Sequence, residues 1–194
     1  RRIGSKFGDI GRIAAGNLLA ELTSTISSSV ISPTIRFAAD APQLAFNAEG
    51  SINALRTQAG DAIASRFEQF ALNDAPKLGI SPTLALEASS QILTQQRQLG
   101  FTAAEAEQNT KDNLRILAAI KATNPNLTDQ EAVQVLTAPD RGEFDSIQRY
   151  IPLINAARVE QEALAISGKT NKKALTELDK ARAVQSLKMK GNII

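Results

Sequence analysis

The chain of 194 residues carries 22 basic and 20 acidic residues, for a formal net charge of +2, and it contains neither histidine nor cysteine. Those two absences exclude disulfides, thiol nucleophiles, histidine general bases and the usual ligand sets for zinc, haem and iron–sulfur clusters. A Ser-His-Asp hydrolase is therefore excluded, whereas catalysis by paired carboxylates or by a Ser-Lys dyad remains open.

The apolar residues indicate helices packed closely through small aliphatic side chains. The chain has 31 Ala, 20 Leu and 18 Ile against only 5 Val, and its aromatic residues are 7 Phe and 1 Tyr without Trp. Ala and Leu are strong helix formers, and no segment of useful length alternates with the period of a strand. We therefore predict an all-α fold: a multi-helix array of antiparallel helical hairpins with an extended amphipathic N-terminal helix.

Charge divides the chain into three parts. Residues 1–36 hold five basic and two acidic residues, residues 123–167 hold three and seven, and residues 168–194 hold seven and two. We interpret residues 1–36 as a basic, glycine-punctuated amphipathic arm, residues 37–167 as a helical body and residues 168–194 as a basic C-terminal helix. Basic ends on an acidic body suit contact with nucleic acid, an anionic membrane or a neighbouring copy of the chain, although such ends are also commonly just solvated.

The first segment repeats apolar residues at the helical period but interrupts them with four glycines. Each glycine costs up to about 1 kcal/mol in a helix interior, so this helix needs a partner, a bend or a membrane surface. Three interpretations remain open: an ordinary packed helix, an interfacial membrane helix and a targeting segment. The residues expected to contact a membrane or a partner lie at its start: Arg1, Arg2, Ile3, Lys6, Phe7 and Arg12. No run of about 18 apolar residues predicts a transmembrane span.

The next segment is expected to form one amphipathic helix up to about Leu72. Its apolar residues from Ile52 to Phe70 recur at spacings of three and four, and Ser51 is the expected N-cap. Phe67 and Phe70 fall on that face and are interpreted as core residues.

The middle of the chain carries the clearest local signals. Ser81 followed by Pro82 predicts a helix start, and Gly100 predicts its end in the left-handed conformation. Thr102 and Glu105 form a capping box that opens a second helix, which Asn124-Pro125 stops. Since about three residues join the two helices, we expect them to run antiparallel and in contact.

Three further helices are expected after Pro125. Thr128 and Glu131 form a second capping box, and Ala138-Pro139 ends the short helix that it opens. A longer helix is predicted from about Asp140 to Gly168, with a kink or break near Tyr150 because Pro152 follows. The last is predicted over residues 170–190.

Basic side chains of the last segment are the candidate contacts for phosphate groups or for an acidic partner. They are Lys169, Lys172, Lys173, Lys180, Arg182, Lys188 and Lys190. Because aromatic residues for base stacking are missing, binding of nucleic acid through them is expected to be nonspecific and salt-sensitive. The simpler interpretation is that these basic side chains are solvated on the surface of a helix.

No pattern of carboxylates predicts a catalytic or metal site. Glu105 and Glu107 stand two residues apart, so they cannot share a helix face. Asp140, Glu143 and Asp145 cluster but lack the ligand spacing of a calcium loop. We therefore expect no enzyme, no metal and no cofactor.

The chain is rich in Ala and Gln, lacks His, Cys and Trp, and begins with a basic segment. In these features it resembles the internal virion proteins of tailed bacteriophages, also called ejection or core proteins. The resemblance implies a structural protein that packs with copies of itself and with other structural proteins, inside the virion or in the conduit that delivers the genome. Two alternatives stay open: a membrane-surface module acting through residues 1–35, and a helical adaptor with a groove near Phe67, Phe70 and Phe101.

Overall fold

The computed structural model describes residues 49–191, which form an all-α array of helices without a strand in that range. Residues 49–59 are helical, and the longer helices that follow are α3 (Asp61–Asn73), α4 (Pro82–Gln98), α5 (Ala103–Thr123), α6 (Asp129–Thr137), α8 (Ala156–Ser167) and α9 (Glu177–Lys190). Short elements lie between them: η1 (Pro76–Leu78), η2 (Ala138–Arg141), α7 (Asp145–Gln148) and η3 (Lys172–Ala174). The predicted N-terminal helix lies outside the described residues.

The helix boundaries in the middle of the chain confirm the capping predictions. The Ser81 hydroxyl accepts a hydrogen bond from the Leu84 amide at 3.1 Å. The capping boxes at Thr102 and Thr128 both form. In each, the glutamate side chain, Glu105 or Glu131, accepts a hydrogen bond from the backbone amide of the threonine. Gly100 takes the expected left-handed conformation with φ 93°, so the chain turns sharply between α4 and α5.

Two predicted boundaries are wrong. The helix expected to begin after Ser51 already includes residues 49 and 50. It then stops at Gly60, whose φ of 84° lies in the left-handed region, and α3 begins at the next residue. A continuous apolar stripe from Ile52 to Phe70 concealed this break, because two short helices that meet at an angle can bury the same face as one long helix.

The segment after Ala138 also differs from the predicted long helix. The chain continues as η2 and α7, leaves helical structure around Pro152, and resumes as α8 at Ala156 with Asn155 as its N-cap. The last helix begins only at Glu177, where Thr176 and Asp179 form a third capping box. The prediction of a break near Tyr150 is confirmed, but the break is a full interruption.

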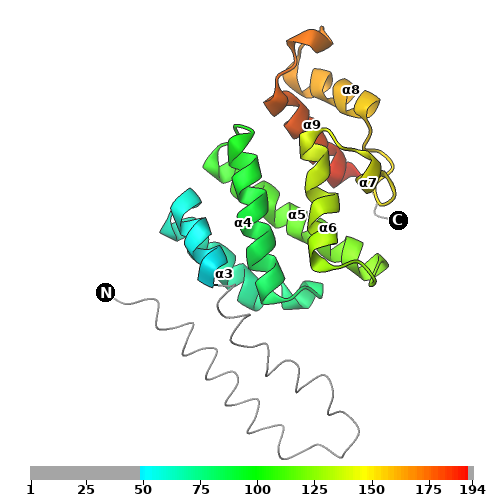
Figure 1. Ribbon diagram of the computed structural model, residues 1–194. Coiled ribbons are helices and arrows are strands. Elements are labelled where there is room, and N and C mark those ends of the chain that lie inside the picture. Colours follow the sequence, from blue (N-terminus) through cyan, green and yellow to red (C-terminus); the bar gives the residue numbers. More distant parts are fainter. Residues whose placement is uncertain (1–48, 192–194) are drawn as a thin grey trace, which may run out of the picture.

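The core joins all the longer helices into one apolar cluster, and α9 belongs to it. In Figure 1, α9 lies between α8 on its outer side and α5 and α6 on its inner side. Ala181, Ala183, Val184 and Leu187 of α9 are buried together with the core residues of α4 and α5. The packing therefore continues across the expected boundary at residue 168.

Candidate functional site

A groove with mostly uncharged polar residues lies beside α4, where this helix faces the end of α6 and η2. Its volume is about 510 Å³, and it is lined by Ser90, Gln91, Thr94, Gln95, Gln98, Leu99, Thr137, Asp140 and Arg141. Six of these nine residues carry a hydroxyl or an amide group, Leu99 is apolar, and Asp140 and Arg141 are charged. The groove thus offers donors and acceptors of hydrogen bonds together with apolar surface from the carbon atoms of its lining side chains.

Local hydrogen bonds hold the walls of this groove in place. The Gln95 side chain donates to the Thr137 carbonyl at 3.1 Å, which ties α4 to the end of α6. The Thr94 hydroxyl donates to the Ser90 carbonyl at 2.6 Å and also to the side chain of Gln58. The groove is therefore a fixed feature between helices.

Asp140, at one wall of the groove, forms a buried ion pair with Lys188 of α9. Lys188 Nζ lies 3.2 Å from each carboxylate oxygen, and the two side chains are 0% and 1% exposed. Lys188 is not among the residues that line the groove. The pair therefore lies between η2 and α9, and the fully buried ammonium is not accessible from the groove.

Burial acts on both members of the pair. Loss of hydration raises the pKa of Asp140 and lowers the pKa of Lys188, while the attraction between the two groups opposes both shifts. Since either charge alone in this site would lack hydration, each depends on the other. The arrangement is a structural bridge between two elements far apart in sequence.

Amide side chains extend this network between α4, α5 and α9. Gln96 donates to Asp140 at 3.4 Å, and Asn109 donates to Gln96 at 2.9 Å. Asn113 of α5 donates to Gln185 of α9 at 3.0 Å. One further acceptor, Asn113 Oδ1, and one further donor, Gln185 Nε2, are buried without a partner among the described residues. The contact between α5 and α9 is therefore polar and only partly satisfied.

The seven basic residues predicted as phosphate or partner contacts are mostly engaged within the chain. Six lie within 4 Å of a carboxylate: Lys169 with Asp179, Lys172 with Glu160, Lys180 with Glu177, Arg182 with Glu105, Lys188 with Asp140, and Lys190 with Glu162. Only Lys173 has no such partner within residues 49–191, and it is exposed.

Lys188 does not fit the expectation of a surface contact, because its side chain is fully buried. The sequence does contain a signal for this: Ala181, Val184 and Lys188 recur at three and four, so Lys188 continues a buried stripe of α9. Its charge led the prediction to place it in solvent. Asp140 gave no such signal, since an acidic residue beside a turn is ordinarily solvated.

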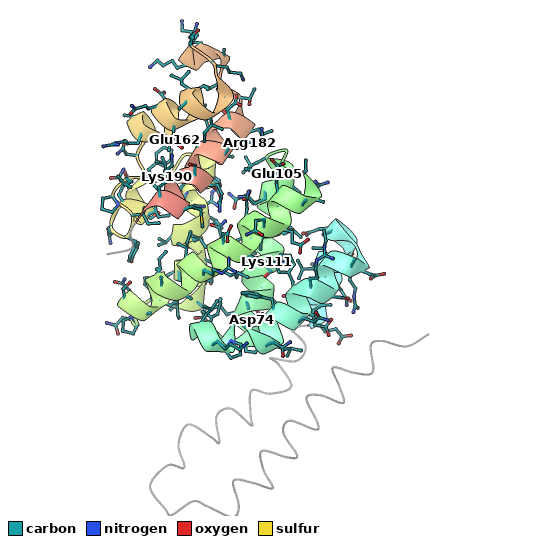
Figure 2. The ribbon with its side chains drawn as sticks, turned by 180° about the vertical axis from the view of Figure 1, so that it is seen from behind. Asp74, Glu105, Lys111, Glu162, Arg182 and Lys190 are labelled. Atoms are coloured by element: carbon teal, nitrogen blue, oxygen red, sulfur yellow. The ribbon has the colours of Figure 1, made fainter. Side chains whose placement is uncertain are left out.

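Figure 2 shows two of these ion pairs from behind. Arg182 of α9 lies next to Glu105 at the start of α5, with 2.8 Å between Nη2 and Oε1. Lys190 lies next to Glu162 of α8, at 2.6 Å. Basic side chains of α9 therefore fasten this helix to its neighbours on both sides.

A second hollow, of about 640 Å³, lies between α3 and α5. Its basic lining residues are Arg66, Lys77, Lys111 and Arg115. Each of them lies next to a carboxylate: Glu107 faces both Arg66 and Lys111, Asp74 faces Lys77, and Asp112 faces Arg115. The hollow is consequently close to neutral and offers no concentrated site for an anion.

The aromatic residues proposed to line an adaptor groove are buried. Phe67, Phe70 and Phe101 are 0%, 9% and 3% exposed, which places all three in the core. The interpretation of Phe67 and Phe70 as core residues is confirmed. Phe70 lies at the edge of the hollow between α3 and α5, whereas Phe67 and Phe101 line neither of the two hollows.

The remaining predictions concern the N-terminal contact residues, metal sites and membrane-spanning helices. Arg1, Arg2, Ile3, Lys6, Phe7 and Arg12 lie outside residues 49–191, so their contact with a membrane or partner stays a prediction. Within residues 49–191, no group of three acidic residues could hold a metal ion. In the same range, no helix has the length and hydrophobicity needed to cross a bilayer.

Comparison with known proteins gives no match for this chain, whether against family models, curated proteins or solved structures.

Proposed function

We propose that the chain is a non-enzymatic structural protein that assembles with copies of itself, and with other structural proteins, through its helical faces. The observation that carries this proposal is the groove beside α4, most of whose lining residues are uncharged and polar. Its hydroxyl and amide groups belong to a helix face that the rest of residues 49–191 leaves open. Side chains of this kind make hydrogen bonds across helix–helix contacts.

The distribution of charge supports the same conclusion. Residues 49–191 contain 17 basic and 17 acidic residues, and nearly all the cations of the last segment already face carboxylates of the chain. A surface whose charges are paired internally contributes little to attraction of nucleic acid. Contacts through uncharged polar side chains, and through exposed apolar ones such as Ile166 and Met189, therefore remain available for association.

The resemblance to internal virion proteins of tailed bacteriophages gives this assembly a role. On that interpretation, several copies pack around the channel through which the genome leaves the virion, and the protein resides in the virion interior or in the ejected conduit. Support for this part of the proposal comes from the composition and from residues 1–36. Contact of residues 1–36 with a membrane surface would be compatible with it.

The test is the molar mass of the purified chain by light scattering at about 50 mM and 500 mM salt, a range over which exposed charge pairs are strongly screened. We expect a discrete oligomer at both salt concentrations, because most residues of the groove are uncharged and its two charged residues, Asp140 and Arg141, each pair with a residue of the chain. Gln91→Glu combined with Gln98→Glu places two like charges in the groove and should dissociate the oligomer. Gln130→Glu, at an exposed position outside the groove, is the matched control. A monomer at both salt concentrations and high protein concentration would refute the proposal.

A further inference from the structure

One face of α4 stays open in the part of the chain that the structure describes. Figure 1 shows α4 between α3 and α6, with α5 crossing behind it, and all three helices contact α4. Gln91 and Gln98 are exposed and stand seven residues apart, which is about two turns, so they lie on the same open face. The residues of α4 that line the groove surround this face: Ser90, Gln91, Thr94, Gln95 and Gln98.

The same helix carries two charged residues, Glu87 and Arg97. Glu87 precedes Gln91 by four positions and therefore lies on the open face, whereas Arg97 follows Thr94 by three positions and lies along its edge. Among residues 49–191, no cation lies within 4 Å of the Glu87 carboxylate, and no carboxylate lies within 4 Å of the Arg97 guanidinium. Both charges of α4 are thus available to a second molecule.

The surroundings of these two charges favour a partner of opposite sign. Partial burial and, to a smaller extent, the charge of nearby Asp129 raise the pKa of Glu87. An approaching cation would oppose this effect and stabilise the charged carboxylate. Arg97 Nη1 donates to the Phe101 carbonyl at 2.8 Å, which holds the guanidinium near the end of α4. The two charges therefore have fixed places along the helix.

The order of these groups along α4 is self-complementary. Glu87 and Arg97 are ten residues apart, and Gln91 lies one residue from their midpoint. In two antiparallel copies of α4 related by a two-fold axis near residue 92, Glu87 of each copy would lie opposite Arg97 of the other. Like charges would lie about 15 Å apart along the helix axes, farther than the screening length of about 8 Å at physiological salt. Parallel helices would instead bring like charges together.

We propose that two copies of this chain associate through their α4 helices, packed antiparallel about a two-fold axis near residue 92. Gln91 of each copy faces Gln91 of the other, and an amide side chain supplies both the donor and the acceptor for this contact. Gln98 of one copy lies near Glu87 of the other. The charged contacts are exposed, so they orient the two copies more than they increase the affinity. This inference rests on the proposed function and names the partner and the register of the groove contact.

Disulfide formation tests the register, because the chain has no cysteine of its own. In the proposed arrangement the two copies of residue 91 lie about 3 Å apart along the helix axes, and the two copies of residue 98 lie about 18 Å apart. A disulfide requires Cα atoms within about 7 Å of each other. Gln91→Cys should therefore form several-fold more covalent dimer under mild oxidation than Gln98→Cys, its matched control on the same exposed face. Non-reducing gel electrophoresis measures the dimer.

Charge reversal tests the reciprocal contact. Glu87→Arg and Arg97→Glu, each alone, bring like charges together twice in every dimer and should lower the oligomer fraction several-fold, as measured by light scattering at about 50 mM salt, where screening is weak. A mixture of the two variants should recover association, because one copy then presents two cations to two carboxylates of the other. Lys173→Glu, at an exposed position outside α4, is the control for Arg97→Glu.

The outcomes separate this inference from the proposed function. An assembly in which Gln91→Cys forms no more covalent dimer than Gln98→Cys overturns the antiparallel contact, while assembly itself stands. Mixed charge variants that associate no better than either variant alone also overturn it, provided that circular dichroism shows both variants folded. Where a charge variant does not fold, the comparison of the two cysteine variants decides. If the unmodified chain stays monomeric under all conditions, the proposed function fails, and this inference falls with it.

Discussion

The central pair α4–α5 and the hairpin α8–α9 are both formed by two helices that follow each other in the chain, yet different forces hold them. Large aliphatic side chains such as Ile92, Leu93, Leu114 and Leu117 are buried where α4 and α5 pack. The hairpin meets the rest of the molecule through aliphatic side chains of α9, such as Leu178 and Leu187, and through the polar residues Arg182, Gln185 and Lys188. Burial of apolar side chains increases the free energy of unfolding without requiring specific partners. Buried polar groups require specific partners and add little net free energy of unfolding.

We infer that the centre of the chain is held mainly by apolar burial, whereas the position of α9 also depends on buried polar partners. If the central pair is the stable unit, its amides should exchange hydrogen more slowly than those of α8 and α9. The following predictions test whether the central pair and the hairpin differ in this way.

The largest effect is expected from Lys188→Ala. Removing the ammonium leaves the Asp140 carboxylate buried without its partner, which costs about 3–5 kcal/mol. Urea denaturation measures the loss in free energy of unfolding. Native-state hydrogen exchange should place it in α8 and α9, with α4 and α5 protected until higher denaturant concentration.

The matched control for this change removes both charges. Lys188→Met with Asp140→Leu replaces the pair by apolar side chains of similar volume and should restore most of the lost stability. A double variant as unstable as Lys188→Ala would contradict this expectation. It would show that the ion pair itself increases the free energy of unfolding relative to apolar side chains of similar volume.

A middle-sized effect is expected from the helix caps. Thr102→Ala and Thr176→Ala each remove an N-cap hydroxyl that accepts an amide hydrogen bond, at a cost of about 1 kcal/mol. The loss should affect the whole molecule for Thr102 but mainly α8 and α9 for Thr176. Hydrogen exchange distinguishes the two patterns, and Thr170→Ala, outside any cap, should change neither region.

The smallest effect expected is a loss of stability at low pH. Hydrogen bonds from Arg66 and Lys111 lower the pKa of Glu107 to about 2, from the ordinary 4.5. Because the folded state favours the charged carboxylate, its contribution is complete above about pH 4.5 and disappears as the pH falls toward 2. For a pair this accessible we expect about 1 kcal/mol or less.

Glu107→Gln therefore should be less stable than the unmodified chain at pH 7 and equally stable near pH 2, as measured by urea denaturation. Asp145→Asn, which removes a negative charge at an exposed position, controls for net charge. A difference that persists unchanged at pH 2 would mean that packing, rather than the carboxylate charge, explains the effect. Hydrogen exchange should confine this loss to the central helices.

The sequence alone determined the all-α class and most helix boundaries in the middle of the chain, because those signals are local. A cap such as Thr102 with Glu105 acts within one turn, and Gly100 ends a helix through its own backbone conformation. The break at Gly60 was missed since the apolar stripe continues across it. No local pattern predicts the groove that Gln95 and Gln98 line with Thr137, because its walls come from separate helices.

Only the tertiary structure decided how the charges are used. Lys188 and Asp140 are 48 residues apart; the spacing of Lys188 from Ala181 and Val184 places it on the buried face of α9, but nothing in either segment identifies the other residue as its partner. Their burial depends on where η2 and α9 meet, which no local spacing specifies. A buried charge is stable only beside its partner, so this part of the molecule could be recognised only once the helices were in place.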